Sequence, residues 1–245
     1  MNGESLARQR LSEARSVCVL TGAGISAESG LPTFRGAGGL WREHRVEQLA
    51  SPQGFARDPQ LVWTWYDERR AKHAEVEPNA GHRALAELEA RIGDFTLVTQ
   101  NVDSLHFRAG SRNVLELHGN LREARCNRCA ARRPLEPGVR FAGIAHAGGG
   151  RFRPDIVWFR EALPEDVWKA AVAAAARADV LLVVGTSGQV QPAASLATLA
   201  PEGALVVEVN PETTPLSSYA QVTLRGSAAD VLPRLVAPQT IATAM

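Results

Sequence analysis

The sequence predicts an α/β fold in which a parallel sheet is covered by helices on both faces, with a smaller second module formed by two insertions. Short runs of apolar residues alternate along the chain with helical patterns, and this alternation is typical of βαβ units. The runs are apolar at consecutive positions, as in strands that are buried on both faces. A glycine-rich turn directly follows the first run, which is where such sheets bind phosphate groups.

Five apolar runs are expected to form the strands of this sheet: residues 16–21, 95–99, 113–117, 180–184 and 204–209. An amphipathic helix is expected over residues 81–91, because Leu85, Leu88 and Ile92 recur along one side of it. A second helix is expected over the alanine-rich residues 164–178. Each helix lies between two of the runs, so the strands that it connects are expected to be parallel.

Two stretches interrupt this alternation and are interpreted as insertions. Residues 37–80 are rich in tryptophan and arginine, and residues 122–151 hold the closely spaced Cys126 and Cys129. We predict that the sheet domain comprises residues 1–36, 81–121 and 152–236, that the small module comprises residues 37–80 and 122–151, and that residues 237–245 form a frayed tail.

Composition excludes several classes of protein. The 245 residues include 27 basic and 26 acidic side chains, a formal net charge of +1, so no overall charge favours nucleic acid or an anionic membrane. Apolar stretches stay well below the roughly 18 residues of a membrane span, and the first residues show no basic region followed by an apolar core. We therefore expect a cytoplasmic protein without membrane or nucleic-acid partners. An odd number of cysteines, three, argues against a disulfide framework.

The glycine-rich turn consists of Gly22, Ala23 and Gly24, directly after the first expected strand. Glycines there would let backbone amides and a helix N-terminus approach a pyrophosphate. The turn lacks the last glycine of the G-x-G-x-x-G pattern, because Ala27 takes its place. A merely tight turn is the alternative explanation when the turn is considered alone.

Four further motifs follow in order, and together the five resemble the sirtuins, NAD-dependent protein-lysine deacylases. The motifs are GAGISAESGLPTFRG at 22–36, TQNVDSLH at 99–106, LHG at 117–119, GTS at 185–187 and VNP at 209–211. The resemblance extends from about residue 10 to about residue 236. It implies a Rossmann-like NAD-binding domain, with NAD lying across the carboxyl ends of the strands and acyl-lysine proteins or peptides as the other substrate. The acyl group would be transferred to ADP-ribose, with release of nicotinamide.

The resemblance also implies a set of NAD-binding residues. The glycine turn would approach the pyrophosphate, a second turn would close the opposite side, and a residue after a later strand would bind the adenosine ribose. A mobile loop would cover the nicotinamide half, with Phe34 shielding the reactive carbon from water. The implied residues are Gly22, Ala23, Gly24, Thr33, Phe34, Arg35, Gln100, Asn101, Asp103, Gly185, Thr186, Ser187 and Asn210.

Three residues are candidates for the chemistry. His118 follows an expected strand, and a histidine is suited to take a ribose hydroxyl proton near neutral pH. Asn101 would hold the ribose and a water, and Asp103 would hold the nicotinamide carboxamide. Asp103 could also begin a short helix, a role compatible with catalysis, and His106 is interpreted as structural.

Two groups of residues are candidates for binding the acyl-lysine substrate. Val157, Trp158 and Phe159 resemble the segment that pairs with the peptide through its main chain, although Arg160 stands where the family usually has glycine. Tyr66 and Arg69 lie one helical turn apart and could together bind a carboxylate. They match the pair that marks sirtuins acting on succinyl, malonyl or glutaryl groups. A solvated arginine beside a packed tyrosine is the alternative.

The pair Cys126 and Cys129 is half of the four-cysteine zinc site that the family carries. Ala145 and Gly148 stand where the second pair is expected, and His146 offers one nitrogen. Three ligands and a water make a poor structural site, so we predict a degenerate zinc-ribbon-like insertion without tightly bound zinc. These missing ligands and Arg160 leave a non-catalytic NAD or ADP-ribose sensor as an alternative function. Protein ADP-ribosyl transfer is another.

Overall fold

The computed structural model describes residues 2–33, 46–129 and 131–237. Phe34 and Arg35, predicted to bind the cofactor, lie outside these ranges. Among the described residues, no helix combines the length and apolar character needed to cross a membrane.

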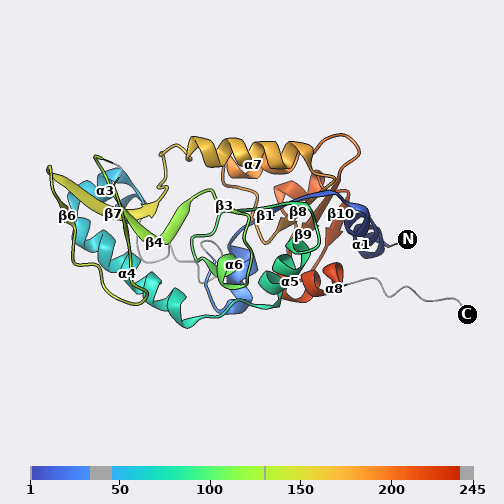
Figure 1. Ribbon diagram of the computed structural model, residues 1–245, viewed down its shortest axis with the longest axis horizontal. Helices are drawn as coiled ribbons and strands as arrows, with labels where there is room; N and C mark the ends of the chain where they lie inside the picture. The colour runs from blue at the N-terminus through green and yellow to red at the C-terminus, as the bar shows by residue number, and fades with distance from the viewer. Residues whose placement is uncertain (1, 34–45, 130, 238–245) are drawn as a thin grey trace, which may run out of the picture.

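The larger part of the protein is a parallel sheet in the strand order β10-β9-β8-β1-β2-β3 (Figure 1). The chain runs outward in one direction from β1 and in the other from β8, so the connection direction reverses between these two central strands. Ligands of such sheets bind outside the carboxyl ends of the strands at this reversal. The strands are β1 (Ser16–Thr21), β2 (Asp94–Thr99), β3 (Val114–Glu116), β8 (Val180–Val184), β9 (Leu205–Val209) and β10 (Val222–Leu224).

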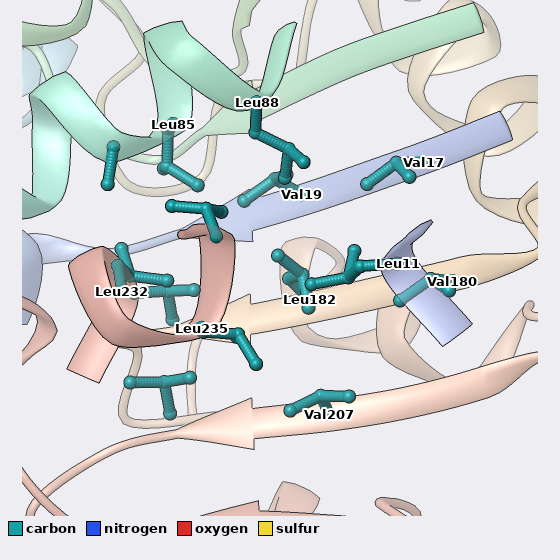
Figure 2. Close-up of a cluster of buried hydrophobic side chains, with 14 of the residues drawn as sticks. Leu11, Val17, Val19, Leu85, Leu88, Val180, Leu182, Val207, Leu232 and Leu235 are labelled. Carbon is teal, nitrogen blue, oxygen red and sulfur yellow. The ribbon is translucent and has the colours of Figure 1, made fainter. Parts of the chain in front are cut away.

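Side chains that alternate along the central strands form two hydrophobic layers. Val17 and Val19 face one layer, whereas Cys18 and Leu20 face the other. Figure 2 shows the first layer, in which Leu11, Leu85 and Leu235 from three helices meet the strands. These helices are α1 (Gly3–Glu13), α5 (Ala80–Glu89) and α8 (Ala228–Val236), and the opposite face is covered by α7 (Glu165–Arg177) and the 3-10 helix η2 (Ala193–Thr198). The predicted α/β class, with helices on both faces, is confirmed.

A second, smaller sheet is antiparallel, in the order β5-β4-β7-β6, and lies at the other end of the molecule (Figure 1). Buried Trp63, Phe55 and Trp158 pack against its strand residues Leu121 and Phe152, so this module has its own apolar core. The strands are β4 (Gly119–Cys126), β5 (Arg132–Pro134), β6 (Ala145–His146) and β7 (Gly150–Ile156), and the helices beside them are α2 (Val46–Leu49), α3 (Pro52–Arg57) and α4 (Pro59–Glu75). The small sheet begins before and ends after the predicted insertion 122–151.

Candidate active site

Two glycine turns meet where β1 and β8 end. The amide of Gly22 donates to the carbonyl of Val184 at 3.1 Å, and the amide of Gly24 donates to the carbonyl of Gly185 at 2.8 Å. A side chain on Gly24 would place its Cβ 2.7 Å from the Gly185 oxygen. These glycines are therefore required for contact between the turns. The amides of Gly22 and Gly24 are therefore used within the chain, whereas the described bonds of these two turns do not include the amide of Ala23.

The segment after the first turn is the 3-10 helix η1 (Ala23–Ser29), ended by Gly30 at φ 88°. This helix places Ser26, buried at 2% exposure, at the centre of a hydrogen-bond network. Its hydroxyl donates to Asp103 Oδ2 at 2.7 Å and lies 3.2 Å from the donating Nδ2 of Asn101. Asn101 Nδ2 also lies 3.2 Å from the carbonyl of Gly22. The structure thus brings together Asn101, Asp103 and the glycine turn.

Asp103 has the helix-starting contact considered for it. Its Oδ1 accepts the amide of Leu105 at 2.9 Å, at the start of the short helix α6 (Leu105–Arg108). Burial raises the pKa of its carboxyl group, and the bonds from Leu105 and Ser26 partly oppose that increase. A carboxyl group fixed through both oxygens is held in one orientation toward the site.

Two buried histidines lie behind this network. His82 Nδ1 accepts the amide of Asn79 at 3.3 Å, so its proton is on Nε2, which lies 3.4 Å from the Ser26 hydroxyl. His106 Nε2 lies 3.0 Å from the hydroxyl of Thr21, and the two rings are 4.9 Å apart. Burial lowers the pKa of His82 to about 4 and lowers that of His106 well below its ordinary value. Both are neutral supports near neutral pH.

Sequence reasoning missed Ser26 and His82 as site residues. Ser26 was within a recognised motif, and His82 is a polar residue at the beginning of an otherwise apolar helix face. Their contact joins positions 56 residues apart, so no local spacing could predict it.

His118 lies just after β3 and has a defined protonation pattern. Its Nδ1 lies 3.0 Å from the carbonyl of Gln100, an acceptor, which places the proton on Nδ1 and leaves the lone pair on Nε2. Burial lowers the pKa of the ring, and the bond to Gln100 opposes this effect. The next residue, Gly119, has φ 74°, and a side chain there would collide with the carbonyl of Asp155. The turn after His118 therefore requires glycine.

The second glycine turn continues into a chain of polar contacts. Gln100 Nε2 donates to the Thr186 hydroxyl at 2.9 Å, and Asn210 Nδ2 donates to the Thr186 carbonyl at 2.9 Å. Ser187 is exposed beside them, and Gly185 has φ 57°. The predicted residues from three strand ends thus share one edge of the sheet.

A pocket opens between η1 and helix α4 of the small module. Its lining includes Ala23, Ser26, Arg69, Asn101 and Asp103. Arg69 is half-buried, with its guanidinium carbon 3.1 Å from the centroid of the Trp65 ring and its Nη1 donating to the Trp65 carbonyl at 2.8 Å. A cation from the small module therefore lines the same pocket as the amide and carboxyl groups of the sheet domain.

Tyr66, one turn before Arg69, is buried at 4% exposure. Its hydroxyl accepts the Nε1 hydrogen of Trp158 at 2.9 Å. Burial raises the pKa of the phenol well above its ordinary value, so the hydroxyl keeps its proton. Tyr66 is not among the described residues that line the pocket of Arg69, Asn101 and Asp103.

The segment Val157, Trp158 and Phe159 already uses all three of its amides. They donate to the carbonyl of His118 at 2.9 Å, to Glu161 Oε2 at 2.8 Å and to the carbonyl of Ala50 at 3.2 Å, respectively. A peptide strand added here would need other main-chain groups, such as the carbonyl of Val157. Arg160 has φ 71°, the left-handed conformation that explains why glycine is usual at this position.

The fold and the site define a protein that binds a dinucleotide at the reversal point of a parallel sheet, beside a fixed amide, a carboxyl group and a histidine. The family model described as "Sir2 family" matches residues 22–192. A Thermus thermophilus protein named NAD-dependent protein deacylase is 53% identical over 237 residues, covering 95% of this chain and 93% of the relative. This chain belongs to the Sir2 family, the sirtuins.

Solved structures of Sir2 proteins have the same fold. A Sir2 homologue in complex with NAD superposes with a TM-score of 0.88 at 47% identity, covering 95% of this chain and 92% of that one. Sir2Af2 bound to a myristoylated histone peptide has a TM-score of 0.77 at 34% identity, covering 96% and 94%.

Proposed function

We propose that this protein is an NAD-dependent protein-lysine deacylase, which removes the acyl group from a lysine side chain, releases nicotinamide and transfers the acyl group to ADP-ribose. The observation that carries the proposal is the arrangement of His118, Asn101 and Asp103 beside the paired glycine turns. The relatives named deacylases support the same activity. Sir2 proteins bound to NAD and to an acylated peptide support its two substrates.

The residues at the sheet edge fit NAD as a substrate. We propose that NAD lies across the strand ends, with Gly185, Thr186 and Ser187 closing the pyrophosphate side opposite the first glycine turn and Asn210 binding the adenosine ribose. The bond from Asn210 Nδ2 to the Thr186 carbonyl supports this, because it joins the two groups. NAD supplies a ribose carbon with nicotinamide as the leaving group. Asp103 is proposed to bind the carboxamide and Asn101 to bind a ribose hydroxyl, and the bonds that fix both side chains beside the glycine turn support these roles. Thr33, Phe34 and Arg35 are proposed to cover the nicotinamide half.

His118 is proposed as the general base. The proton on Nδ1 is held by the Gln100 carbonyl, so Nε2 is the nitrogen that can accept a proton from a ribose hydroxyl. The lowered pKa keeps this nitrogen unprotonated at neutral pH. In the proposed sequence the amide oxygen of the acyl-lysine first displaces nicotinamide from the ribose carbon, and the hydroxyl oxygen then attacks the acyl carbon. One water is consumed and lysine leaves as the free amine, so the acyl group ends as an ester on ADP-ribose.

The finer proposal concerns the acyl group. We infer that Arg69 pairs with the carboxylate of a succinyl or malonyl group and that Tyr66 supplies a neutral donor. Arg69 supports this inference, because it lines the same pocket as Asn101 and Asp103. A carboxylate would have to compete with the Trp65 carbonyl for the guanidinium. Such competition favours a charged acceptor, because an ionised acceptor binds more strongly than a neutral one.

The test is incubation of the protein with NAD and lysine peptides carrying acetyl, succinyl, malonyl or glutaryl groups. Release of nicotinamide together with O-acyl-ADP-ribose supports the deacylase. Binding of NAD without turnover of any peptide would show a sensor. Labelling of a protein with ADP-ribose in the absence of any acyl group would show ADP-ribosyl transfer.

A further inference from the structure

Three metal-binding side chains converge in the small module. Cys126 is the last residue of β4, Cys129 lies in the following turn, and His146 is the last residue of β6. One donor atom from each lies within 4.8 Å of the others, and Cys129 Sγ is 3.3 Å from His146 Nε2. Within the described part of the chain, these three side chains form the one group of at least three cysteine, histidine or acidic residues that is close enough to hold a metal ion.

The neighbouring chain is shaped around these donors. Strand β7 lies between β4 and β6 and pairs Gly150 with His146. A side chain at Gly150 would place its Cβ 2.5 Å from Cys126 Sγ, so glycine leaves the space that the sulfur occupies. The amide of Arg128 donates to Cys126 Sγ at 3.4 Å, and the His146 ring stands edge-on to Phe152 at 4.7 Å. Both contacts hold the donor groups in place.

The four-cysteine zinc site of the family does not fit this chain, because Ala145 and Gly148 have no ligand atom. Three of four corners are nevertheless available to a tetrahedral ion. Zinc bonds of about 2.3 Å to sulfur and about 2.0 Å to nitrogen give donor separations of roughly 3.5 to 3.8 Å. Cys129 Sγ and His146 Nε2 are 3.3 Å apart, close to that separation, and all three donor atoms lie within 4.8 Å of one another. Cys126 is buried and Cys129 is exposed, so solvent can reach the group from the Cys129 side.

We propose that Cys126, Cys129 and His146 form an open Cys2His site that binds zinc reversibly, with the fourth position taken by a solvent molecule. The module has the apolar core of Trp63, Phe152 and Trp158 and is not assembled around the ion. Binding is therefore separate from folding, unlike in a closed structural site. The site does not depend on the proposed deacylase activity and can be tested without NAD.

The experiment uses the full chain, stripped of metal and kept reduced with a phosphine, titrated with Co²⁺ and then with Zn²⁺. We expect one Co²⁺ per chain, with thiolate charge-transfer absorption and tetrahedral visible bands that zinc abolishes. His146→Ala and Cys129→Ser should each weaken binding by at least about tenfold, the loss produced even by removing an outer partner of a metal ligand. Cys18→Val, which removes the buried cysteine of β1, is the matched control and should bind as the parent does.

The open position is tested on the cobalt form by adding imidazole. A change in the visible bands at constant charge-transfer absorption is expected, because imidazole replaces solvent while both thiolates stay bound. Circular dichroism should not change on metal removal. The proposal is overturned if no cobalt binds, if His146→Ala binds as tightly as the parent, or if the protein carries one zinc that a chelator removes only with unfolding.

Discussion

At the scale of single residues, His118 is the position on which the chemistry depends. We expect His118→Ala to lower the rate of deacylation by about 10²- to 10⁴-fold, the usual contribution of a general base. NAD affinity should change little, because the substitution leaves the glycine turns and Thr186, which are proposed to bind NAD, unchanged. Steady-state kinetics on an acyl peptide and calorimetry with NAD measure the two effects, and near-parental turnover would refute the assignment.

The pH dependence provides a control for this assignment. Protonation of His118 removes the base, so activity must fall as pH decreases through its pKa, which burial lowers below the ordinary value. We therefore expect the acidic limb of kcat/KM to lie below about pH 6.5, the unperturbed histidine value. The residual activity of His118→Ala should lack this limb.

Arg69 is the residue expected to select the acyl group. Loss of a hydrogen bond to a charged partner costs about 1.5 to 3 kcal/mol, so Arg69→Met should lower kcat/KM for succinyl peptides by roughly tenfold to a hundredfold. Deacetylation should change little, because an acetyl group places no carboxylate there. Tyr66→Phe should act in the same direction but more weakly. Equal losses on both peptides would show that Arg69 only supports helix α4.

At the scale of elements, continuous apolar runs predicted β1, β2, β3, β8 and β9 to within one residue at either end. The edge strand β10 was missed, because it has only three residues and Thr223 interrupts its apolar pattern. The small-module strands were also missed, since arginines and Pro134 obscure their alternation.

The proposed NAD-binding residues could be predicted from the sequence, because they follow predicted parallel strands whose carboxyl ends lie at one edge of the sheet. The link from Ser26 to His82 could not, because only tertiary packing brings them together.

A buried ion pair on helix α4, between Arg70 and Asp67, makes hydrogen bonds to the segment 136–141 of the small module. Arg70 Nη1 lies 2.5 Å from Asp67 Oδ1 and 3.0 Å from the Val139 carbonyl, and Asp67 Oδ2 accepts the amide of Phe141 at 2.9 Å. Both side chains are less than 10% exposed. In a module lacking two family zinc ligands, this pair is a principal polar connection between the helix and that segment.

We expect Arg70→Met to destabilise the protein by about 3 to 5 kcal/mol, because it leaves the Asp67 charge buried without its partner. Urea unfolding measures the loss, and limited proteolysis should show faster cleavage within residues 136–141. Lys169→Met is the control, since its pair with Glu165 is exposed and should contribute little. A double variant, Asp67→Leu with Arg70→Met, should recover part of the loss. Parental stability of Arg70→Met would contradict this account.

At the scale of the whole molecule, the buried histidines behind the site connect stability to pH. His82 is fully buried, and its folded-state pKa is lowered to about 4 from an ordinary 6.5. Above pH 6.5 the ring is neutral in both states and has no effect on the pH dependence. As pH falls from 6.5 to about 4, His82 binds a proton in the unfolded chain but not in the folded chain, so the free energy of unfolding decreases. His106 acts in the same direction.

The contribution of His82 can be isolated with His82→Asn, which cannot titrate. A shift of this size corresponds to about 3 kcal/mol over the window, at 1.36 kcal/mol for each pKa unit. At pH 8 the variant should be less stable than the parent, because the bonds to Ser26 and Asn79 are altered. On moving to pH 4.5 the parent should lose more stability than the variant, by about 2 kcal/mol or more. Denaturant unfolding of both proteins at the two pH values gives this difference, in which the packing cost of the substitution cancels. If both proteins lose the same amount, His82 does not carry the pH dependence, and the acid sensitivity must arise at other buried groups.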